Sequence, residues 1–275
     1  MNLIGKRLLK KVAVLALMLP SFGVGDSLTG VRPDLAREQR LADETRDAIV
    51  DGEPLDLVTA QGQSFFSIYT DSTADEAKGT VIILHGRGFH PNWPSVVQPL
   101  RVNLPDAGWH TLSIQLPVLE KTAKYYDYVQ IFPFASARIE AAVKEARARS
   151  DGLLVIAAHS CGAHMAQHWI LSGGVSASAQ FDAFVGIGMG ATDYRQPMVE
   201  PFALDRMRMP VLDVFAEKDF PAVRRLAAER AKALQAVGNP KSAQVVIADA
   251  EHYFEGQGEA LVAVIAEWLE TLRSE

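Results

Sequence analysis

A serine lies between two small residues at the point where an apolar run ends and a helical pattern begins. The run 153–157 is followed by the pentapeptide Ala158-His-Ser-Cys-Gly162. A nucleophilic serine on a sharp strand-to-helix turn needs small residues two positions before and after it, because larger side chains would collide with the neighbouring strand and helix. The N–H groups at the start of the helix face any developing negative charge. The pattern predicts Ser160 as a nucleophile, although such a pentapeptide also occurs by chance.

Cys161 is the alternative nucleophile in this segment. If the turn were centred on Cys161, the bulky ring of His159 would occupy the first small position. Ser160 therefore fits the turn better. We expect Cys161 to be a small buried residue whose backbone N–H stabilises an oxyanion.

A base and an acid follow two later apolar runs. His252 comes shortly after the run 244–248, and a serine needs such an imidazole to accept its proton. Asp219 follows the preceding run and is expected to orient the imidazole, with Glu217 and Asp193 as alternatives. The order serine, acid, histidine is the one expected when all three follow the carboxyl ends of parallel strands.

The segment after the run 80–84 carries two glycines. It reads His85-Gly-Arg-Gly-Phe-His90, and such a loop beside the nucleophile strand can present a backbone N–H to an oxyanion. We expect the N–H of Arg87 to serve in this way, with Gly86 contributing to the substrate site. A plain tight turn is the alternative, and His85 is expected to stabilise that turn rather than to act as a base.

Aromatic residues gather between the run 111–116 and the next helical pattern. This loop spans about 17 residues, and a loop of that length in a compact domain is often functional. Tyr125 and Tyr126 are expected to line an acyl or alcohol pocket, with a surface loop packed on its own rings as the alternative. The connection 191–208 is too short for a large lid, so we expect an open site for small or soluble esters.

Two further groups of residues suggest a metal or a cofactor only superficially. His164 and His168 lie four apart on a predicted helix, but position 165 is Met where a zinc protease motif has Glu. The glycines at 186, 188 and 190 lack the later glycine of a dinucleotide-binding motif. We expect neither a metal nor an organic cofactor.

Short apolar runs alternate with helical patterns along most of the chain. The runs are 64–69, 80–84, 111–116, 153–157, 183–188, 211–215 and 244–248. The helical patterns are about 95–105, 135–149, 162–171, 221–236 and 259–272. Runs of this kind are typical of strands covered on both faces, and their alternation with helices predicts a mostly parallel sheet. We expect a single-domain α/β fold with helices on both faces and no large lid.

Residues 1–25 differ in character from the rest. Four basic residues precede a short apolar core, and Pro20 and small residues follow it. The pattern is typical of a secretory signal peptide, and a core of about eight residues is too short to span a bilayer; a retained anchor is the alternative. We therefore expect an exported protein, periplasmic or secreted. A helical arm and a first strand are expected in residues 26–63, and the main domain in residues 64–275.

Composition and charge narrow the range of partners. The chain has 275 residues, a formal net charge of −6 and one cysteine, Cys161. One cysteine excludes an intrachain disulfide and a multi-cysteine metal site, and the acidic net charge argues against nucleic acid, which requires a basic face for its phosphates. We expect a small-molecule ester as the partner, no nucleic acid, and no stable membrane insertion once the signal peptide is removed. The oligomeric state stays open.

Residues 64–272 resemble the α/β-hydrolase superfamily. The segments 84–94, 104–109 and 116–117 also resemble a group of exported bacterial α/β-hydrolase-like proteins; they read Leu-His-Gly-Arg-Gly-Phe-His-Pro-Asn-Trp-Pro, Leu-Pro-Asp-Ala-Gly-Trp and Leu-Pro. The superfamily resemblance implies a triad of Ser160, His252 and Asp219, with an oxyanion hole from the backbones of Cys161 and Arg87. The residue at position 158 departs from the family pattern, because alanine replaces the usual glycine.

These observations predict a serine hydrolase that cleaves a carboxylic ester or thioester through an acyl-enzyme on Ser160. The first alternative is a non-catalytic binding or envelope protein that keeps the hydrolase fold, because a fold does not fix a function. The second is an acyltransferase that uses the same three side chains. The presence of serine, acid and histidine together argues against the binding protein.

Overall fold

The computed structural model describes residues 30–273, apart from the side chains of residues 174 and 175. Val31–Glu275 is one compact unit. The predicted signal peptide in residues 1–25 lies outside the described residues. Within residues 30–273, no helix has the length and apolar character that crossing a bilayer requires.

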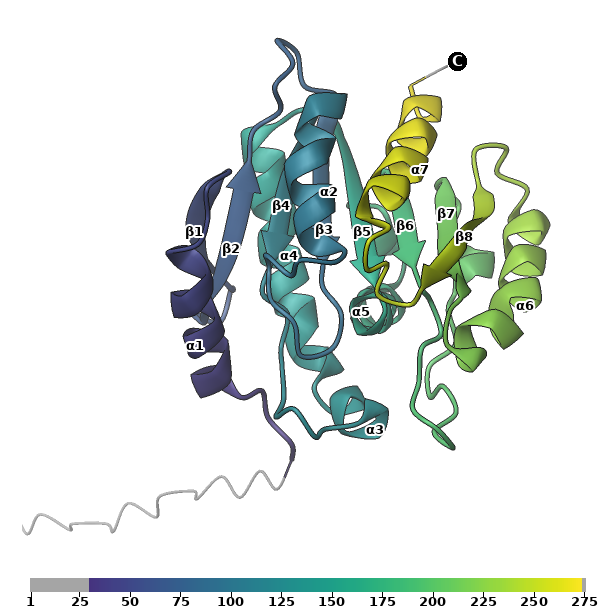
Figure 1. The fold of residues 1–275 in the computed structure, drawn as a ribbon, viewed down its shortest axis with the longest axis horizontal. Coiled ribbons are helices and arrows are strands. Elements are labelled where there is room, and N and C mark those ends of the chain that lie inside the picture. The colour runs from purple at the N-terminus through teal and green to yellow at the C-terminus, as the bar shows by residue number, and fades with distance from the viewer. Residues whose placement is uncertain (1–29, 274–275) are drawn as a thin grey trace, which may run out of the picture. The chain divides into compact units, whose positions relative to one another are not determined.

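A sheet of eight strands lies at the centre of the described unit (Figure 1). In spatial order the strands are β1 (Glu53–Val58), β2 (Ser64–Thr70), β4 (Trp109–Ile114), β3 (Gly79–Leu84), β5 (Leu153–His159), β6 (Ala183–Ile187), β7 (Val211–Lys218) and β8 (Ala243–Glu251). The pairs β1–β2 and β2–β4 are antiparallel, and every pair from β4 to β8 is parallel. The predicted mostly parallel sheet is confirmed.

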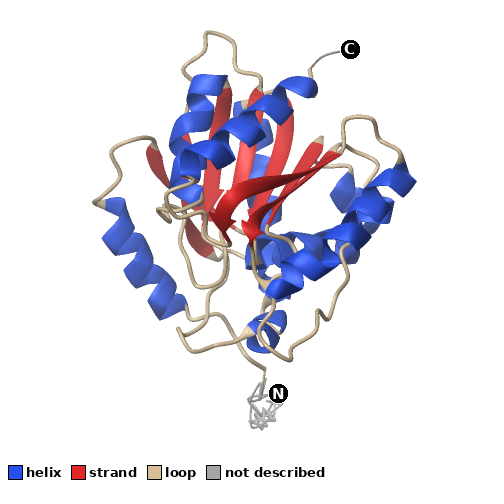
Figure 2. Ribbon diagram, turned by 45° about the vertical axis from the view of Figure 1, so that its right-hand side comes forward, coloured by secondary structure: helices blue, strands red, loops and turns tan. Residues whose placement is uncertain are grey.

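Helices cover both faces of this sheet (Figure 2). One face carries α2 (Val97–Asn103) and α7 (Gly258–Thr271), and the other carries α4 (Phe132–Arg149), α5 (Cys161–Ser178) and α6 (Pro221–Val237). The remaining helices are α1 (Leu35–Arg46), α3 (Tyr125–Val129) and the short 3₁₀ helices η1 (Leu104–Ala107) and η2 (Leu204–Arg206). The predicted α/β class with helices on both faces is confirmed.

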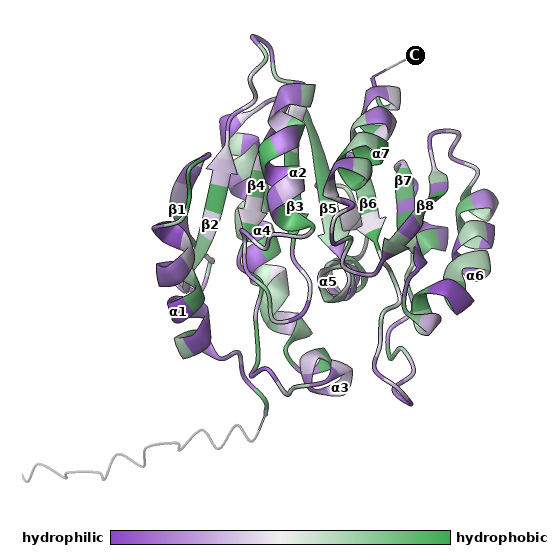
Figure 3. Ribbon diagram, viewed as in Figure 1, coloured by the Kyte–Doolittle hydropathy of each residue, from purple (hydrophilic) through white to green (hydrophobic). Residues whose placement is uncertain are grey.

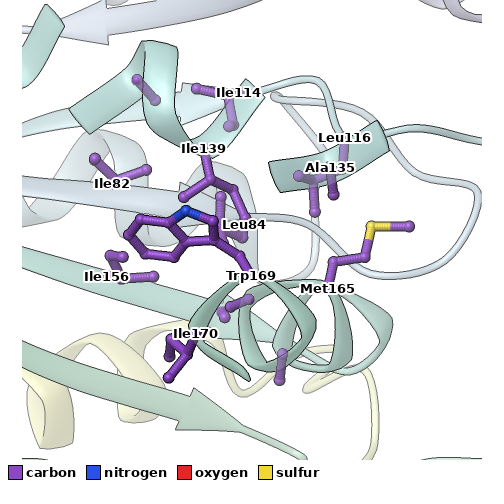
Figure 4. Close-up of a cluster of buried hydrophobic side chains, with 14 of the residues drawn as sticks. Ile82, Leu84, Ile114, Leu116, Ala135, Ile139, Ile156, Met165, Trp169 and Ile170 are labelled. Atoms are coloured by element: carbon purple, nitrogen blue, oxygen red, sulfur yellow. The ribbon is translucent and has the colours of Figure 1, made fainter. Parts of the chain in front are cut away.

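Alternate side chains of the central strands enter two separate cores. Ile82 and Leu84 of β3 lie in the core beneath α4 and α5, whereas Val81 and Ile83 lie in the core beneath α2 and α7. Because successive side chains of a strand point to opposite faces, a strand covered on both sides needs a continuous apolar run. Figure 4 shows the first core around Trp169, and Figure 3 shows hydrophobic residues along the strands.

The segment between β4 and α4 differs from the predicted loop. Helix α3 occupies Tyr125–Val129, and α4 begins at Phe132 rather than at residue 135. Pro133 stands in the first turn of α4. A proline is tolerated there because a backbone N–H in the first turn has no acceptor within the helix, so its absence costs no hydrogen bond. The predicted loop of about 17 residues is therefore wrong, because two helical segments occupy much of it.

Candidate active site

Ser160 occupies a strained turn between β5 and α5. Its φ angle is 54°, a value in the left-handed region that residues other than glycine seldom adopt. The Ser160 N–H donates to the carbonyl oxygen of Ile187 at 2.8 Å, which ties the turn to β6. A Cβ atom at Gly162 would lie 2.5 Å from the carbonyl oxygen of His85. The close approach of these backbones explains why a small residue stands two positions after the serine.

Three side chains form a continuous hydrogen-bonded chain at the carboxyl ends of β5, β7 and β8. His252 Nε2 lies 2.8 Å from Ser160 Oγ, and His252 Nδ1 lies 2.6 Å from Asp219 Oδ1. The carboxylate also accepts hydrogen bonds from the N–H groups of Ala216, at 3.2 Å, and Phe220, at 2.7 Å. The side chains of Ser160, His252 and Asp219 are all buried. The imidazole is thus held between a hydroxyl that it can deprotonate and a carboxylate that fixes its orientation.

The two alternative acids have other partners. Glu217 Oε2 accepts a hydrogen bond from the Asp249 N–H at 2.9 Å. Asp193 accepts one from the Tyr125 N–H at 2.7 Å and forms an ion pair with the guanidinium of Arg87. Burial acts to raise the pKa of Asp193, but the hydrogen bond from Arg87 holds it below its usual value. Of the three carboxylates considered, Asp219 is the one that contacts His252.

Cys161 and Arg87 carry the two backbone N–H groups that are expected to stabilise an oxyanion. Cys161 is the first residue of α5, and Arg87 follows the end of β3 by three residues. Within residues 30–273, neither backbone N–H donates a hydrogen bond. Burial raises the pKa of the Cys161 thiol to about 12, so the thiol is protonated at neutral pH and is a poor nucleophile. These features favour Ser160 as the nucleophile and leave the Cys161 backbone available to an oxyanion.

A cavity of about 530 Å³ opens beside Ser160. Its wall includes Tyr125 and Phe220, and the Phe220 ring stacks on the His252 imidazole with 4.1 Å between centroids. Two residues expected at the substrate site lie elsewhere. Gly86 packs against His159 and Phe89 outside the cavity wall, and Tyr126, which is 41% exposed, does not line the cavity.

Comparison with solved structures identifies the architecture. The chain is similar to an α/β serine hydrolase homologue from Coxiella burnetii, with 19% identity, a TM-score of 0.59, and 80% of this chain and 98% of that chain covered. The chain has the α/β-hydrolase fold. It is also similar to the esterase Pf2001 from Pyrococcus furiosus, with 16% identity, a TM-score of 0.62, and 82% and 93% of the two chains covered.

Other comparisons add less about the activity. XC6422 from Xanthomonas campestris, described as a serine hydrolase without lid, has 15% identity and a TM-score of 0.60, with 82% of this chain and 98% of that chain covered. The family model described as "Protein of unknown function (DUF3530)" matches residues 27–130. No curated protein matches the sequence.

A buried histidine and a half-buried arginine hold the glycine-containing loop of this α/β-hydrolase fold. His85 Nε2 accepts a hydrogen bond from the Leu116 N–H at 2.9 Å, so Nδ1 carries the proton and donates to the Gly86 carbonyl oxygen at 2.7 Å. Burial lowers the pKa of His85 to about 3, which keeps the ring neutral. Arg37 of α1 donates to the Gly88 carbonyl oxygen at 2.9 Å. The loop that carries the Arg87 N–H is therefore fixed from both sides.

Two residues that support His252 were not predicted from the sequence. His159 Nε2 donates to the His252 carbonyl oxygen at 3.1 Å, and burial lowers the pKa of His159 to about 3. Gly188, with a φ angle of 61°, leaves room for the imidazole: a Cβ there would lie 3.0 Å from His252 Cε1 and 3.1 Å from Nδ1. A signal for Gly188 existed, because it directly follows β6, at the edge of the sheet where active sites of parallel sheets lie.

Replacing Gly188 with alanine is expected to displace the His252 ring by a few tenths of an ångström and to lower kcat for ester hydrolysis by about tenfold or more. The positive φ angle adds a stability cost of about 1–2 kcal/mol. Gly256→Ala is the matched control, because Gly256 has a φ angle of 71° and open space around its Cβ position. Urea unfolding and steady-state kinetics should show similar stability losses but an activity loss in Gly188→Ala alone. Equal activity in the two variants would contradict this role.

The histidines of α5 have protein partners rather than a metal-binding arrangement. His164 Nε2 donates to the Ala191 carbonyl oxygen at 3.1 Å, and His168 Nδ1 lies 2.9 Å from a carboxylate oxygen of Glu200. In the described part of the chain, no group of three or more His, Cys, Asp or Glu side chains is placed to hold a metal ion. The two histidines therefore serve packing and hydrogen bonding.

Proposed function

We propose that this protein is a serine hydrolase that cleaves a carboxylic ester or a thioester through an acyl-enzyme on Ser160. The observation that carries the proposal is the hydrogen-bonded chain from Ser160 Oγ through both nitrogens of His252 to Asp219. A protein that only binds a ligand has no need of an alcohol, an imidazole and a carboxylate joined in this order. The relatives described as serine hydrolases and esterases support the same class.

The mechanism follows from the geometry. Ser160 Oγ attacks the acyl carbonyl while His252 Nε2 takes its proton, and Asp219 stabilises the resulting imidazolium. The N–H groups of Cys161 and Arg87 donate to the oxyanion of the tetrahedral intermediate. His252 then gives the proton to the leaving alcohol or thiol, which leaves an acyl group on Ser160. Water, activated in the same way, releases the acid and restores the serine.

The open site favours small or soluble substrates. The segment between β6 and β7 contains only the three-residue helix η2, so it supplies no large helical lid. A cavity of about 530 Å³ lies within the range of small-molecule sites. We further propose that the protein is exported, on the signal-peptide pattern in residues 1–25. Cell fractionation with an antibody to the protein tests this part.

A fluorophosphonate probe tests the proposal directly, because a serine activated to attack an ester carbonyl also attacks the phosphorus of the probe. The serine displaces fluoride and becomes phosphonylated. Intact-mass measurement should show one added label on the wild type and none on Ser160→Ala. Cys161→Ala is the control, since it removes the neighbouring thiol but keeps the backbone N–H and the hydroxyl. Label on Ser160→Ala would place the nucleophile elsewhere. Absence of both label and ester turnover in the folded wild type would favour the non-catalytic binding protein.

A further inference from the structure

The cavity beside Ser160 has the opposite charge to the chain as a whole. The sequence carries a formal net charge of −6. The charged side chains in the cavity wall are nevertheless three arginines, Arg87, Arg195 and Arg225, and one aspartate, Asp193. The wall is thus a local positive region on an acidic protein, and a region of this kind raises the local concentration of anions.

Two of these arginines have no acidic partner in the part of the chain that the structure describes. Asp193 is already engaged by Arg87 and by the Tyr125 N–H. Among residues 30–273, no carboxylate forms an ion pair with Arg195 or Arg225. Arg147 and Arg230, by contrast, each form an ion pair with an acid, Asp182 and Asp213 respectively. With Asp193 paired to Arg87, the charges of the cavity wall that remain uncompensated are the two guanidinium groups of Arg195 and Arg225.

The two arginines approach the cavity from different elements. Arg225 lies on the second turn of α6, whose first residues Pro221 and Ala222 belong to the same wall. Arg195 lies in the segment between β6 and β7, and its guanidinium stands 5.0 Å from the centroid of the Tyr194 ring. Two guanidinium groups from separate walls suit a carboxylate, because each group offers several N–H donors to its oxygens.

We propose that the substrate is an ester that carries a carboxylate, which Arg195 and Arg225 bind while Ser160 attacks the ester carbonyl. This inference rests on the proposed serine hydrolase activity and adds the substrate class. The carboxylate belongs either to the acyl chain, as in a half-ester of a dicarboxylic acid, or to the alcohol. Both arrangements share the same recognition chemistry, and the choice between them is part of the test.

Matched ester pairs separate charge from size. For the acyl side, mono-4-nitrophenyl adipate is compared with 4-nitrophenyl hexanoate; for the alcohol side, 4-acetoxybenzoate is compared with its methyl ester. Each rate is normalised to the alkaline hydrolysis of the same ester. We expect one anionic member to exceed its neutral partner in kcat/KM by about tenfold or more, and this preference should shrink as salt is added.

Arginine variants show whether the preference comes from these side chains. Arg195→Gln and Arg225→Gln should each reduce the ratio of anionic to neutral kcat/KM by about 5- to 10-fold. Arg224→Gln is the control, because Arg224 precedes Arg225 on α6 but does not line the cavity. It should leave the ratio unchanged.

The outcomes distinguish a wrong substrate class from a wrong hydrolase assignment. Turnover of the neutral esters that depends on Ser160, with no preference for either anionic ester, overturns the inference and leaves the hydrolase activity standing. The same conclusion follows if Arg224→Gln reduces the ratio as much as Arg225→Gln does. Absence of turnover on all four esters, together with absence of fluorophosphonate labelling, overturns both.

Discussion

Ser160→Ala and His252→Ala are each expected to lower kcat for an activated ester by about 10⁶-fold, and the double variant by no more than either alone. The two side chains act as one unit, because the hydroxyl is a weak nucleophile without the imidazole 2.8 Å away, and the imidazole has nothing to deprotonate without the hydroxyl. The N–H groups of Cys161 and Arg87 remain in every variant and are expected to sustain the residual rate.

Asp219→Asn is expected to lower kcat by about 10⁴-fold, because the amide no longer favours the His252 tautomer with its proton on Nδ1. Glu217→Gln is the matched control: Glu217 lies two residues earlier and binds the Asp249 N–H instead of the imidazole. Its kcat should stay close to that of the wild type. Steady-state kinetics with 4-nitrophenyl acetate measure kcat for the Ser160 and His252 variants and for the Asp219 and Glu217 variants. Additive losses at Ser160 and His252, or equal losses at Asp219 and Glu217, would contradict the assigned roles.

Acid is expected to unfold the protein well above the pH at which its surface carboxylates are protonated. Burial lowers the pKa of His85 and His159 to about 3 and that of His164 to about 4. The unfolded chain binds these protons near pH 6.5, whereas the folded chain excludes them. These histidines therefore leave the free energy of unfolding unchanged above about pH 7 and lower it as the pH falls from about 6.5 towards 4.

The size of this acid effect is comparable with the whole stability of a domain. Each neutral buried imidazole costs up to about 1.4 kcal/mol per pH unit below its unfolded pKa, so three cost about 8 kcal/mol at pH 4.5. A typical domain is stable by about 5–15 kcal/mol. Burial also raises the pKa of Glu38 and Asp213, which acts in the opposite direction. Burial also lowers the pKa of His90 to about 4, so four histidines oppose these two carboxyl groups and stability should fall.

Urea unfolding at a series of pH values measures this slope. The free energy of unfolding should be nearly constant between pH 7.5 and 8.5 and should decline below pH 6.5. His164→Gln can keep the hydrogen bond to the Ala191 carbonyl without titrating. At pH 5 this variant should therefore take up about one proton fewer on unfolding than the wild type. A free energy of unfolding that stays flat down to pH 5 would show that the buried histidines do not control acid stability.

The sequence was sufficient to predict the strands and the three side chains of the candidate site, because both depend on local patterns. A strand with α4 and α5 on one side and α2 and α7 on the other must be apolar at every position, and this makes its run visible. The carboxyl ends of parallel strands meet at one edge, so residues that directly follow the runs converge. Ser160, Asp219 and His252 satisfy that rule, and the structure joins them by hydrogen bonds.

The residues that support the site depend on contacts between distant segments, and the sequence did not reveal them. Gly188 is required by the ring of His252, which lies on another strand-to-helix connection. Asp193 pairs with Arg87, which lies more than a hundred residues earlier. Because the sequence does not show this contact, Asp193 could be predicted only as an alternative acid that follows a strand. Helix α3 has five residues, too few to show a helical period in the sequence.

The separation of Ser160 and His252 along the chain has a consequence for biosynthesis. The two residues are 92 positions apart, and His252 lies in the loop that follows β8, at the edge of the sheet. A growing polypeptide therefore exposes Ser160 long before it contains the imidazole. On the proposed mechanism, Ser160 is an ordinary alcohol until β8 is synthesised and pairs with β7, so reactive esters in the surroundings meet no activated nucleophile. The proposed activity therefore requires the completed sheet.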